Sequence, residues 1–343
     1  MTTTPPTPEQ RPKLSYIAKL TGTTPSTVSK VINGRDGVSE RTREHIEATL
    51  QRLGYSKPPV RHATSATIAV VSMAFNQPWI PNMLQGANDY AISHGMTVTV
   101  CTKSNTDRTR DDRYLTVIRR AKPLAVVFDS AYVSMQDRTL AQETQFPYAV
   151  VDPSGTPSRD CAEVRIDNWA GGWEAGRHLL ELGHRRFAVI TGDPALACFP
   201  ARVDGFRAAL REAGVMLDER MIVDGDNWME RSRSHALRLL SADDRPTAIF
   251  ACSDIQAYGV YDAAHQLGLS IPDDLSVIGF DDIESSSHLA PPLTTIRQPF
   301  AGMTRMAFEL LLDRRDPSMP DKLLVPPALV ARGSTAPPCD QSS

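Results

Sequence analysis

Long apolar runs, paired cysteines and aromatic side chains are all scarce in this chain of 343 residues. No apolar stretch approaches the roughly 20 residues that cross a bilayer, so we expect no membrane segment. The N-terminal MTTTPPTPEQRP has no apolar centre and does not resemble a signal peptide, which favours a cytoplasmic protein. The five cysteines are widely spaced and never form C-x-x-C, a pattern that argues against a disulfide framework and a zinc site.

Signatures of catalysis are also missing. The sequence has no G-x-S-x-G elbow, no G-x-x-x-x-G-K-[ST] phosphate loop and no H-E-x-x-H pair. A glycine-rich dinucleotide fingerprint is absent after the first expected strand. We therefore expect neither an enzyme nor a bound cofactor or metal. The hydrophobic content of 41% and charged content of 22% are ordinary for a soluble protein of two or three domains.

The stretch Leu14–Gly54 has the pattern of three short helices, and the first two have the proportions of a helix-turn-helix. The first helix ends at Thr21-Gly22-Thr23, where glycine permits a tight bend. Thr24 is a good N-cap for the second helix, with Pro25 at its first position, and Ser39 caps the third. Apolar residues at helical spacing predict the buried face: Ile17, Leu20, Val28, Val31, Ile32, Ile46, Leu50 and Leu53.

The charge of this region distinguishes a unit that binds a polyanion from a helical bundle without a partner. A helical bundle without a partner has no need for strong charge of one sign. Between Arg11 and Arg61, however, ten basic and four acidic residues give about +6, whereas the whole chain carries −3. This asymmetry favours a polyanionic partner, and together with the turn chemistry it predicts DNA binding.

From Ile68 onward, short β-branched runs alternate with amphipathic stretches, which is typical of parallel sheets covered on both faces by helices. The runs fall into two groups and predict two doubly wound lobes. Expected strands are Ile68–Met73, Val98–Cys101, Leu124–Phe128, Tyr148–Val151 and Val164–Ile166, then Phe187–Ile190, Ile222-Val223, Ala248–Ala251 and Ser276–Ile278. A late crossing near Leu293–Gln298 is expected to return the chain to the first lobe.

In such sheets, ligands bind beyond the carboxyl ends of the strands. Carboxylates there accept hydrogen bonds from hydroxyls, an arginine donates, and a tryptophan offers an apolar face, so the combination suits a sugar. An aspartate at a strand end is alternatively a helix N-cap, and for Asp254 that role is as reasonable as ligand contact. The candidate residues are Trp79, Asp129, Asp152, Arg202, Trp228, Asp254 and Asp281.

Two long segments resemble the LacI-type bacterial transcriptional repressors. They are IAKLTGTTPSTVSKVINGRDGVSERTREHIEATLQRLGY and RPTAIFACSDIQAYGVYDAAHQLGLSIPDDLSVIGFDDI, the latter followed by PPLTTIRQP. The resemblance extends over nearly the whole chain, and details are similar to regulators of cellobiose, xylose and related sugars. It implies an all-α headpiece, a periplasmic-binding-protein-like core of two lobes, a homodimer, a pseudo-palindromic operator and a small effector between the lobes.

The resemblance also implies roles for individual residues. Pro25, Ser26 and Lys30 match base-reading positions. The other expected DNA contacts are Ser15, Thr24, Thr27, Ser29 and Asn33, together with Lys57 and Arg61 of the linker. In the core, Arg202 matches a sugar-clamping arginine and Asp281 a hydroxyl-binding aspartate. Asp129 and Asp152 match polar cleft positions, Trp228 an aromatic platform and Trp79 an apolar contact.

The expected domains are an arm at 1–11, a headpiece at 12–57, a hinge at 58–67, a core at 68–333 and a disordered tail at 334–343. The hinge SKPPVRHAT departs from the family because it lacks the leucine that wedges into the minor groove. Three alternatives stay open: a purine-type corepressor mode, a sugar-binding protein whose DNA role is secondary, and an architectural DNA-binding protein whose core binds no ligand.

Overall fold

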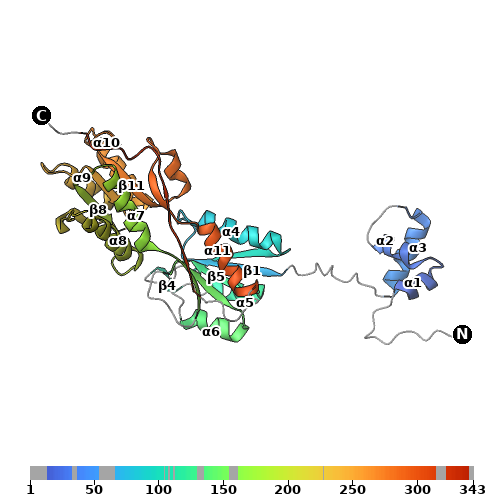
Figure 1. The fold of residues 1–343 in the computed structure, drawn as a ribbon. Coiled ribbons are helices and arrows are strands. Elements are labelled where there is room, and N and C mark those ends of the chain that lie inside the picture. Colours follow the sequence, from blue (N-terminus) through green and yellow to red (C-terminus); the bar gives the residue numbers. More distant parts are fainter. Residues whose placement is uncertain are drawn as a thin grey trace. The chain divides into compact units, whose positions relative to one another are not determined.

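The structure is a computed structural model that describes residues 14–32, 37–53, 66–103, 105–106, 109–110, 113–129, 135–153, 161–226, 228–313 and 322–339. The chain forms two compact units, Met1–Ser65 and Ala66–Ser343 (Figure 1). The first unit is the headpiece, and the second is the core. The expected fold class, a helical headpiece and an α/β core of two lobes, is confirmed.

The headpiece consists of α1 (Leu14–Leu20), α2 (Pro25–Ile32) and α3 (Glu40–Arg52). Both expected N-caps are present: the Thr24 hydroxyl accepts from the Thr27 amide at 3.2 Å, and the Ser39 hydroxyl accepts from the Thr42 amide at 3.3 Å. Ile17, Val28 and Ile46 are fully buried at the centre of the unit.

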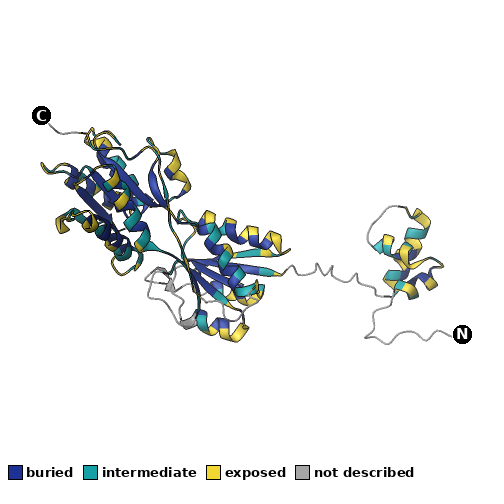
Figure 2. Cartoon of the chain, viewed as in Figure 1, coloured by how far each residue is buried: buried dark blue, intermediate teal, exposed yellow. Residues whose placement is uncertain are grey.

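Not every residue expected in the headpiece core is inside it. Leu20 is 47% exposed, because it is the last residue of α1 and lies beside the turn. Leu50 and Leu53 are only partly buried, and they pack at the margin of the cluster around Ile46. In Figure 2, the helices of this unit carry exposed and intermediate segments beside buried ones. Such a small unit buries few side chains completely.

The first lobe of the core has a six-stranded sheet in the order β13-β7-β6-β5-β1-β2, and all its pairings are parallel. Along β1, Ile68 and Val70 face one hydrophobic cluster, while Ala69 and Val71 face another. Helices α4 and α11 cover the first face and α5 and α6 the second, so both faces are buried. The strands are β1 (Thr67–Ser72), β2 (Thr97–Thr102), β5 (Val126–Asp129), β6 (Tyr148–Val151), β7 (Ala162–Ile166) and β13 (Lys322–Val325), and the helices are α4 (Ile80–Ser93), α5 (Arg113–Ala121), α6 (Met135–Thr144) and α11 (Phe300–Phe308). A small antiparallel hairpin joins β3 (Asn105–Thr106) to β4 (Thr109–Arg110).

The second lobe has a sheet in the order β14-β12-β11-β10-β8-β9. All its pairings are parallel except that of the edge strand β14 with β12. Helices α7 and α8 cover one face, and α9 and α10 cover the other. The strands are β8 (Phe187–Thr191), β9 (Ile222–Asp224), β10 (Ala248–Ala251), β11 (Ser276–Asp281), β12 (Thr294–Arg297) and β14 (Ala328–Val330), and the helices are α7 (Asn168–Glu181), α8 (Cys198–Glu212), α9 (Met229–Leu240) and α10 (Asp254–Gln266).

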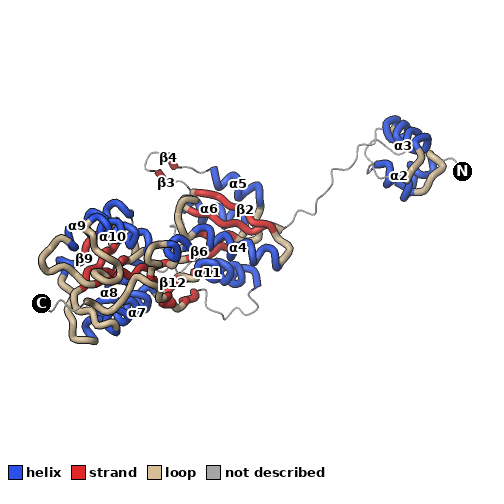
Figure 3. Tube along the Cα trace, turned by 90° about the horizontal axis from the view of Figure 1, so that it is seen from above, coloured by secondary structure: helices blue, strands red, loops and turns tan. Residues whose placement is uncertain are grey.

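The chain passes between the lobes three times (Figure 3). The first passage joins β7 to α7, and the second joins β12 to α11, which packs beside α4 in the first lobe. The third joins β13 to β14. The expected late crossing is therefore present just after Arg297, although Thr294–Arg297 themselves form a strand of the second lobe.

The segment Ser334–Cys339 corrects the expectation of a disordered tail from residue 334 onward. The hydroxyl of Ser334, which is fully buried, donates to the Val277 carbonyl at 2.6 Å and accepts from the Thr294 amide at 2.7 Å. The Ala336 amide donates to the Ser276 hydroxyl at 3.0 Å. These bonds attach the segment to β11 and β12, so the core continues to Cys339.

No helix in the described parts of the chain is both long enough and apolar enough to traverse a bilayer.

Candidate functional site

Helix α2 presents its polar face outward because Val28 and Val31 are buried on the opposite side. Among the candidate DNA contacts, Ser15, Thr24, Pro25, Ser26 and Lys30 are exposed, whereas Thr27 and Ser29 are partly buried. The expected contacts Asn33, Lys57 and Arg61, and most of the expected hinge, lie outside the described residues. The exposed row on α2 therefore offers a lysine, a hydroxyl and a proline to a partner.

Arg202 is the centre of the candidate ligand site in the core. It lies in the second turn of α8 and is only 3% exposed. Its Nε donates to Oδ1 of Asn168 at 2.7 Å, and its Nη1 donates to the carbonyl oxygen of Cys252 at 2.6 Å. Nη1 also lies 3.4 Å from Oδ1 of Asp281. The guanidinium is thus held by residues from α7, β11 and the end of β10.

Close packing of α7 against α8 fixes the position of Arg202 along the axis of α8 relative to α7. A Cβ added at Gly172 would lie 1.9 Å from the carbonyl oxygen of Arg202, and one added at Gly205 would lie 1.9 Å from that of Trp169. Only glycine allows the two backbones to approach this closely. The pattern R-x-x-G, Arg202 to Gly205, thereby joins the central arginine of the candidate site to a helix contact.

Asp281 is the last residue of β11, and its carboxylate is nearly buried between Arg202 and Gln298. Nε2 of Gln298 donates to Oδ1 of Asp281 at 2.6 Å, while Oε1 of Gln298 is buried and has no hydrogen-bond partner among the described residues. Burial raises the pKa of Asp281 to about 6, although nearby Arg202 acts in the opposite direction. The site therefore holds two acceptors, the Asp281 carboxylate and Oε1 of Gln298.

Asp152 brings the first lobe to the same cluster. It follows β6, and its φ of +47° lies in the left-handed region that non-glycine residues rarely adopt. Burial raises the pKa of Asp152, and the positive charges of Arg202 and Arg165 lower it. Arg202 thus interacts with carboxylates from both lobes, and one guanidinium faces two acidic groups.

Asp129 and Trp79 meet in the first lobe. Oδ2 of Asp129 accepts from the hydroxyl of Ser72 at 2.6 Å, and Oδ1 accepts from the amide of Met73 at 3.2 Å. Trp79 also hydrogen-bonds to this carboxylate and stacks against Phe300, with 6.2 Å between the ring centroids. Asp129 is nearly buried and orients the residues that follow β1.

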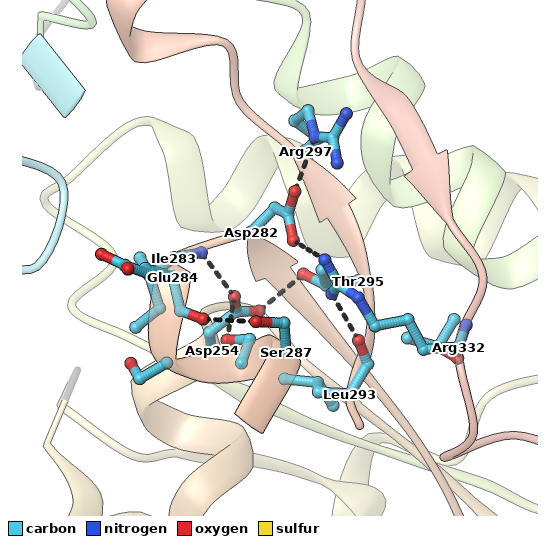
Figure 4. A network of polar contacts seen from close by, with 12 residues as sticks. Asp254, Asp282, Ile283, Glu284, Ser287, Leu293, Thr295, Arg297 and Arg332 are labelled. Atoms are coloured by element: carbon cyan, nitrogen blue, oxygen red, sulfur yellow. Dashed lines mark hydrogen bonds and ion pairs between the residues drawn. The ribbon is translucent and has the colours of Figure 1, made fainter. Parts of the chain in front are cut away.

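Asp254 does not belong to the ligand site, which corrects the expectation. Its carboxylate is fully buried, with Oδ1 accepting from Thr295 at 2.6 Å and Oδ2 accepting from the Ile283 amide at 3.0 Å and from Ser286 at 2.6 Å (Figure 4). Burial raises its pKa to about 8. The N-cap alternative is also wrong, because Ser253 caps α10.

Trp228 lies at the surface of the second lobe. It precedes α9 and is 60% exposed. In the described parts of the chain, no hydrogen bond joins its side chain to Arg202, Asp281 or Gln298. The structure therefore unites Asp152, Arg202 and Asp281, places Asp129 with Trp79, and leaves Trp228 on the surface.

Sequence reasoning missed three parts of the site: Asn168, Gln298 and Phe280. Asn168 begins α7 directly after a lobe crossing, and Gln298 directly precedes another. The sequence signal that could have identified Asn168 and Gln298 is their position, since both are polar residues at points where the chain passes between the lobes.

In the described regions, no group of three or more His, Cys, Asp or Glu side chains is placed to hold a metal ion.

Comparisons with known proteins agree with this arrangement. Residues 13–57 match the family of bacterial regulatory proteins described as lacI, and residues 177–335 match a periplasmic binding protein-like domain. The transcriptional regulator DegA of Bacillus subtilis is 32% identical over 332 residues, which cover 94% of this chain and 97% of DegA. The transcriptional repressor PurR of Yersinia pestis (strain Pestoides F) is 33% identical over 329 residues, covering 93% and 96% of the two chains.

A solved structure described as the regulator CelR in complex with cellobiose is also similar. It superposes with a TM-score of 0.69 at 30% identity and covers 94% of this chain and all of that one. The two matched regions indicate the same family as the nearly full-length relatives. These relatives are transcriptional regulators and not enzymes. The chain is a transcriptional regulator and belongs to the LacI family.

Proposed function

We propose that this regulator is a cytoplasmic homodimeric repressor that leaves its operator when an uncharged sugar, a mono- or disaccharide, binds around Arg202. The observation that carries the proposal is the polar cluster in the core. Arg202 supplies donors, Asp281 and Asp152 supply acceptors, and Oε1 of Gln298 is a buried acceptor without a partner. Sugar hydroxyls donate and accept hydrogen bonds, so they satisfy both kinds of group.

The charges of the site favour an uncharged ligand. The carboxylates of Asp152 and Asp281 already face the cations Arg202 and Arg165, so an added phosphate or carboxylate group finds no unpaired cation. Burying such a charge without a cationic partner is costly. The similarity to CelR, whose structure contains cellobiose, supports the same ligand class.

For DNA, α2 is proposed to enter the major groove, where Pro25, Ser26 and Lys30 read bases. Ser15, Thr24, Thr27, Ser29 and Asn33 are proposed to contact the backbone, and Lys57 at the end of the headpiece and Arg61 of the hinge at 58–67 extend those contacts. Two headpieces in a dimer bind two half-sites. Since cationic side chains displace counterions from DNA, affinity is expected to fall steeply with salt.

A gel-shift titration tests the proposal. The full-length protein is mixed with duplex fragments from its own promoter region, and cellobiose, glucose, xylose, ribose, glucose 6-phosphate, guanine or hypoxanthine is added. Release of DNA by an uncharged sugar, but not by glucose 6-phosphate, supports the proposal. Tighter DNA binding with a purine indicates the corepressor mode instead, and an absence of DNA binding at low salt refutes the DNA role.

A further inference from the structure

Asp281 and its neighbour Asp282 point to different partners. Whereas the Asp281 carboxylate contacts Arg202 and Gln298, Oδ2 of Asp282 accepts from Nε of Arg297 at 2.6 Å and Oδ1 accepts from Nη2 of Arg332 at 2.5 Å (Figure 4). The Asp282 side chain is 8% exposed. It is therefore shielded from solvent between two arginines and makes no contact with the Arg202 guanidinium in the structure.

Arg297 borders a connection between the lobes, and Arg332 lies beyond the strand that follows another. Arg297 ends β12, immediately before the passage to α11 in the first lobe. Arg332 follows β14, which the chain enters directly after leaving β13 of the first lobe. Arg332 is itself anchored, because its Nη1 donates to the Leu293 carbonyl at 2.7 Å. The carboxylate of Asp282 thus joins the start of the passage from β12 to α11, and the segment that follows β14, to the end of β11.

The backbone at this point needs such support. Asp281 has a φ of +112° and Asp282 a φ of +55°, and non-glycine residues adopt these values only where their surroundings hold them. On one side of the turn, the two arginines hold Asp282. On the other side, the Ile283 amide donates to Asp254 at 3.0 Å. The Gln298 amide also donates to the carbonyl of Asp281 at 3.3 Å. The direction of the Asp281 carboxylate follows from this turn.

We infer that Asp282 is a positioning residue for effector binding: through Arg297 and Arg332 it fixes the turn that aims Asp281 at the ligand, and through Arg297 it links that turn to the passage between β12 and α11. The inference rests on the proposed function, since it assumes that Asp281 binds the effector. Because Arg297 directly precedes that passage, a change in the lobe arrangement that displaces it also acts on the turn at Asp282, so ligand contact and lobe arrangement are coupled through one side chain.

The test uses Asp282→Asn in the full-length protein, a change that keeps the side-chain size and removes the charge. Calorimetry measures affinity for whichever sugar of the gel-shift panel binds the wild type most tightly. The expected result is a loss of affinity of about tenfold or more, because charge-assisted bonds at the turn are weakened. The matched control is Asp262→Asn, which removes an Arg–Asp pair of the same lobe (Arg233, 3.1 Å) remote from the connections. It is expected to bind as the wild type does.

Hydrogen exchange of the unliganded protein supplies a second readout. Asp282→Asn is expected to speed exchange at the amides of Ile283 and Gln298 while the rest of the second lobe keeps its protection. The inference requires both the affinity loss and this local change. Faster exchange throughout the lobe indicates a general structural role and overturns it, as does an affinity equal to that of the wild type.

The two proposals fail in distinguishable ways. If the wild type binds no sugar of the panel, the proposed effector class is wrong, and the exchange experiment alone then decides whether Asp282 holds the turn. Unchanged exchange at Ile283 and Gln298 refutes that role. If the wild type binds a sugar and Asp282→Asn binds it equally well, the proposed function stands and the positioning role is refuted.

Discussion

The guanidinium of Arg202 lies over the ring of Phe280, with its Cζ 3.7 Å from the ring centroid. Phe280 directly precedes Asp281 in β11, so one strand supplies both the ring and the carboxylate that the arginine contacts. A desolvated contact of this kind contributes about 2 kcal/mol. The arginine is therefore held in place before any ligand arrives, which reduces the conformational entropy lost on binding.

Replacing Arg202 with alanine is expected to abolish the response to the effector while leaving DNA binding intact. The change removes the donors of the site, leaves Asp281 without its cation and leaves Asp152 with Arg165 alone. A gel shift with and without effector measures the response. Arg207→Ala is the control, because Arg207 lies on the same helix but pairs with Glu219 at the surface. An Arg202 variant that still responds contradicts the assignment.

Replacing Lys30 with alanine is expected to reduce discrimination between operator and random DNA. Lys30 is exposed in the last turn of α2, and loss of one base contact costs about 1–3 kcal/mol of discrimination. Competition gel shifts with both DNAs provide the measurement. Lys19→Ala, which removes an exposed lysine in the last turn of α1, controls for charge alone. Equal losses on both DNAs would identify Lys30 as a phosphate contact instead.

Effector affinity is expected to weaken as the pH falls through about 6, the pKa to which burial raises Asp281. The ionised carboxylate accepts hydrogen bonds from ligand hydroxyls, and protonation removes that capacity. One proton then costs about tenfold in affinity per pH unit below the pKa. Calorimetry between pH 5 and 8 measures this dependence, with Asp281→Asn as the control. A wild-type affinity that stays constant over this range would show that the ionised form is not needed.

Gly172→Ala is expected to destabilise the core and weaken effector binding together. Because the added methyl group meets the Arg202 carbonyl oxygen at 1.9 Å, α7 and α8 must separate, at a cost of about 1–3 kcal/mol. Gly302→Ala is the matched control: it also lies in a helix, but its added Cβ has its nearest neighbour at 3.9 Å. Thermal unfolding and calorimetry check both variants. A stable Gly172→Ala with normal affinity would show that the helices separate at no cost.

Ending the chain after Gly333 is expected to destabilise the core, whereas ending it after Cys339 is expected to have little effect. The shorter chain loses the buried hydroxyl of Ser334 and leaves the Thr294 amide without its acceptor. Buried groups left unpaired cost about 1–3 kcal/mol each. Denaturant unfolding of the two truncated proteins measures the difference. If the two truncated proteins are equally stable, the hydrogen bonds of residues 334–339 do not contribute to the stability of the core.

Local patterns predicted those parts of the fold that depend on neighbours in sequence. The turn at Gly22, the caps at Thr24 and Ser39 and the strand at Ala248–Ala251 each follow from a few adjacent residues. Arg202 is predicted because it comes shortly after a strand end and matches the R-x-x-G pattern of the LacI-type resemblance, and the glycine of that pattern is the one that lets α8 approach α7. At these positions, the local sequence pattern and the tertiary contacts favour the same residue type.

The parts that were missed depend on contacts between distant segments. The role of Asp254 is set by Thr295, 41 residues away, and that of Ser334 by Val277, 57 residues away. Nothing in the sequence around either residue distinguishes a ligand-binding aspartate from a buried one, or a mobile serine from a bonded one. The pairing of Gln298 with Asp281 likewise appears only once β12 lies beside β11.

The placement of α11 and β13 has a consequence for biosynthesis. Both belong to the first lobe, yet they are encoded after almost the entire second lobe. A nascent chain can complete its three headpiece helices early, because their contacts are local, but the first sheet lacks an edge strand and a covering helix until translation is nearly over. The headpiece can thus be complete on the ribosome long before the core, and a chain that ends before Lys322 lacks both β13 and β14.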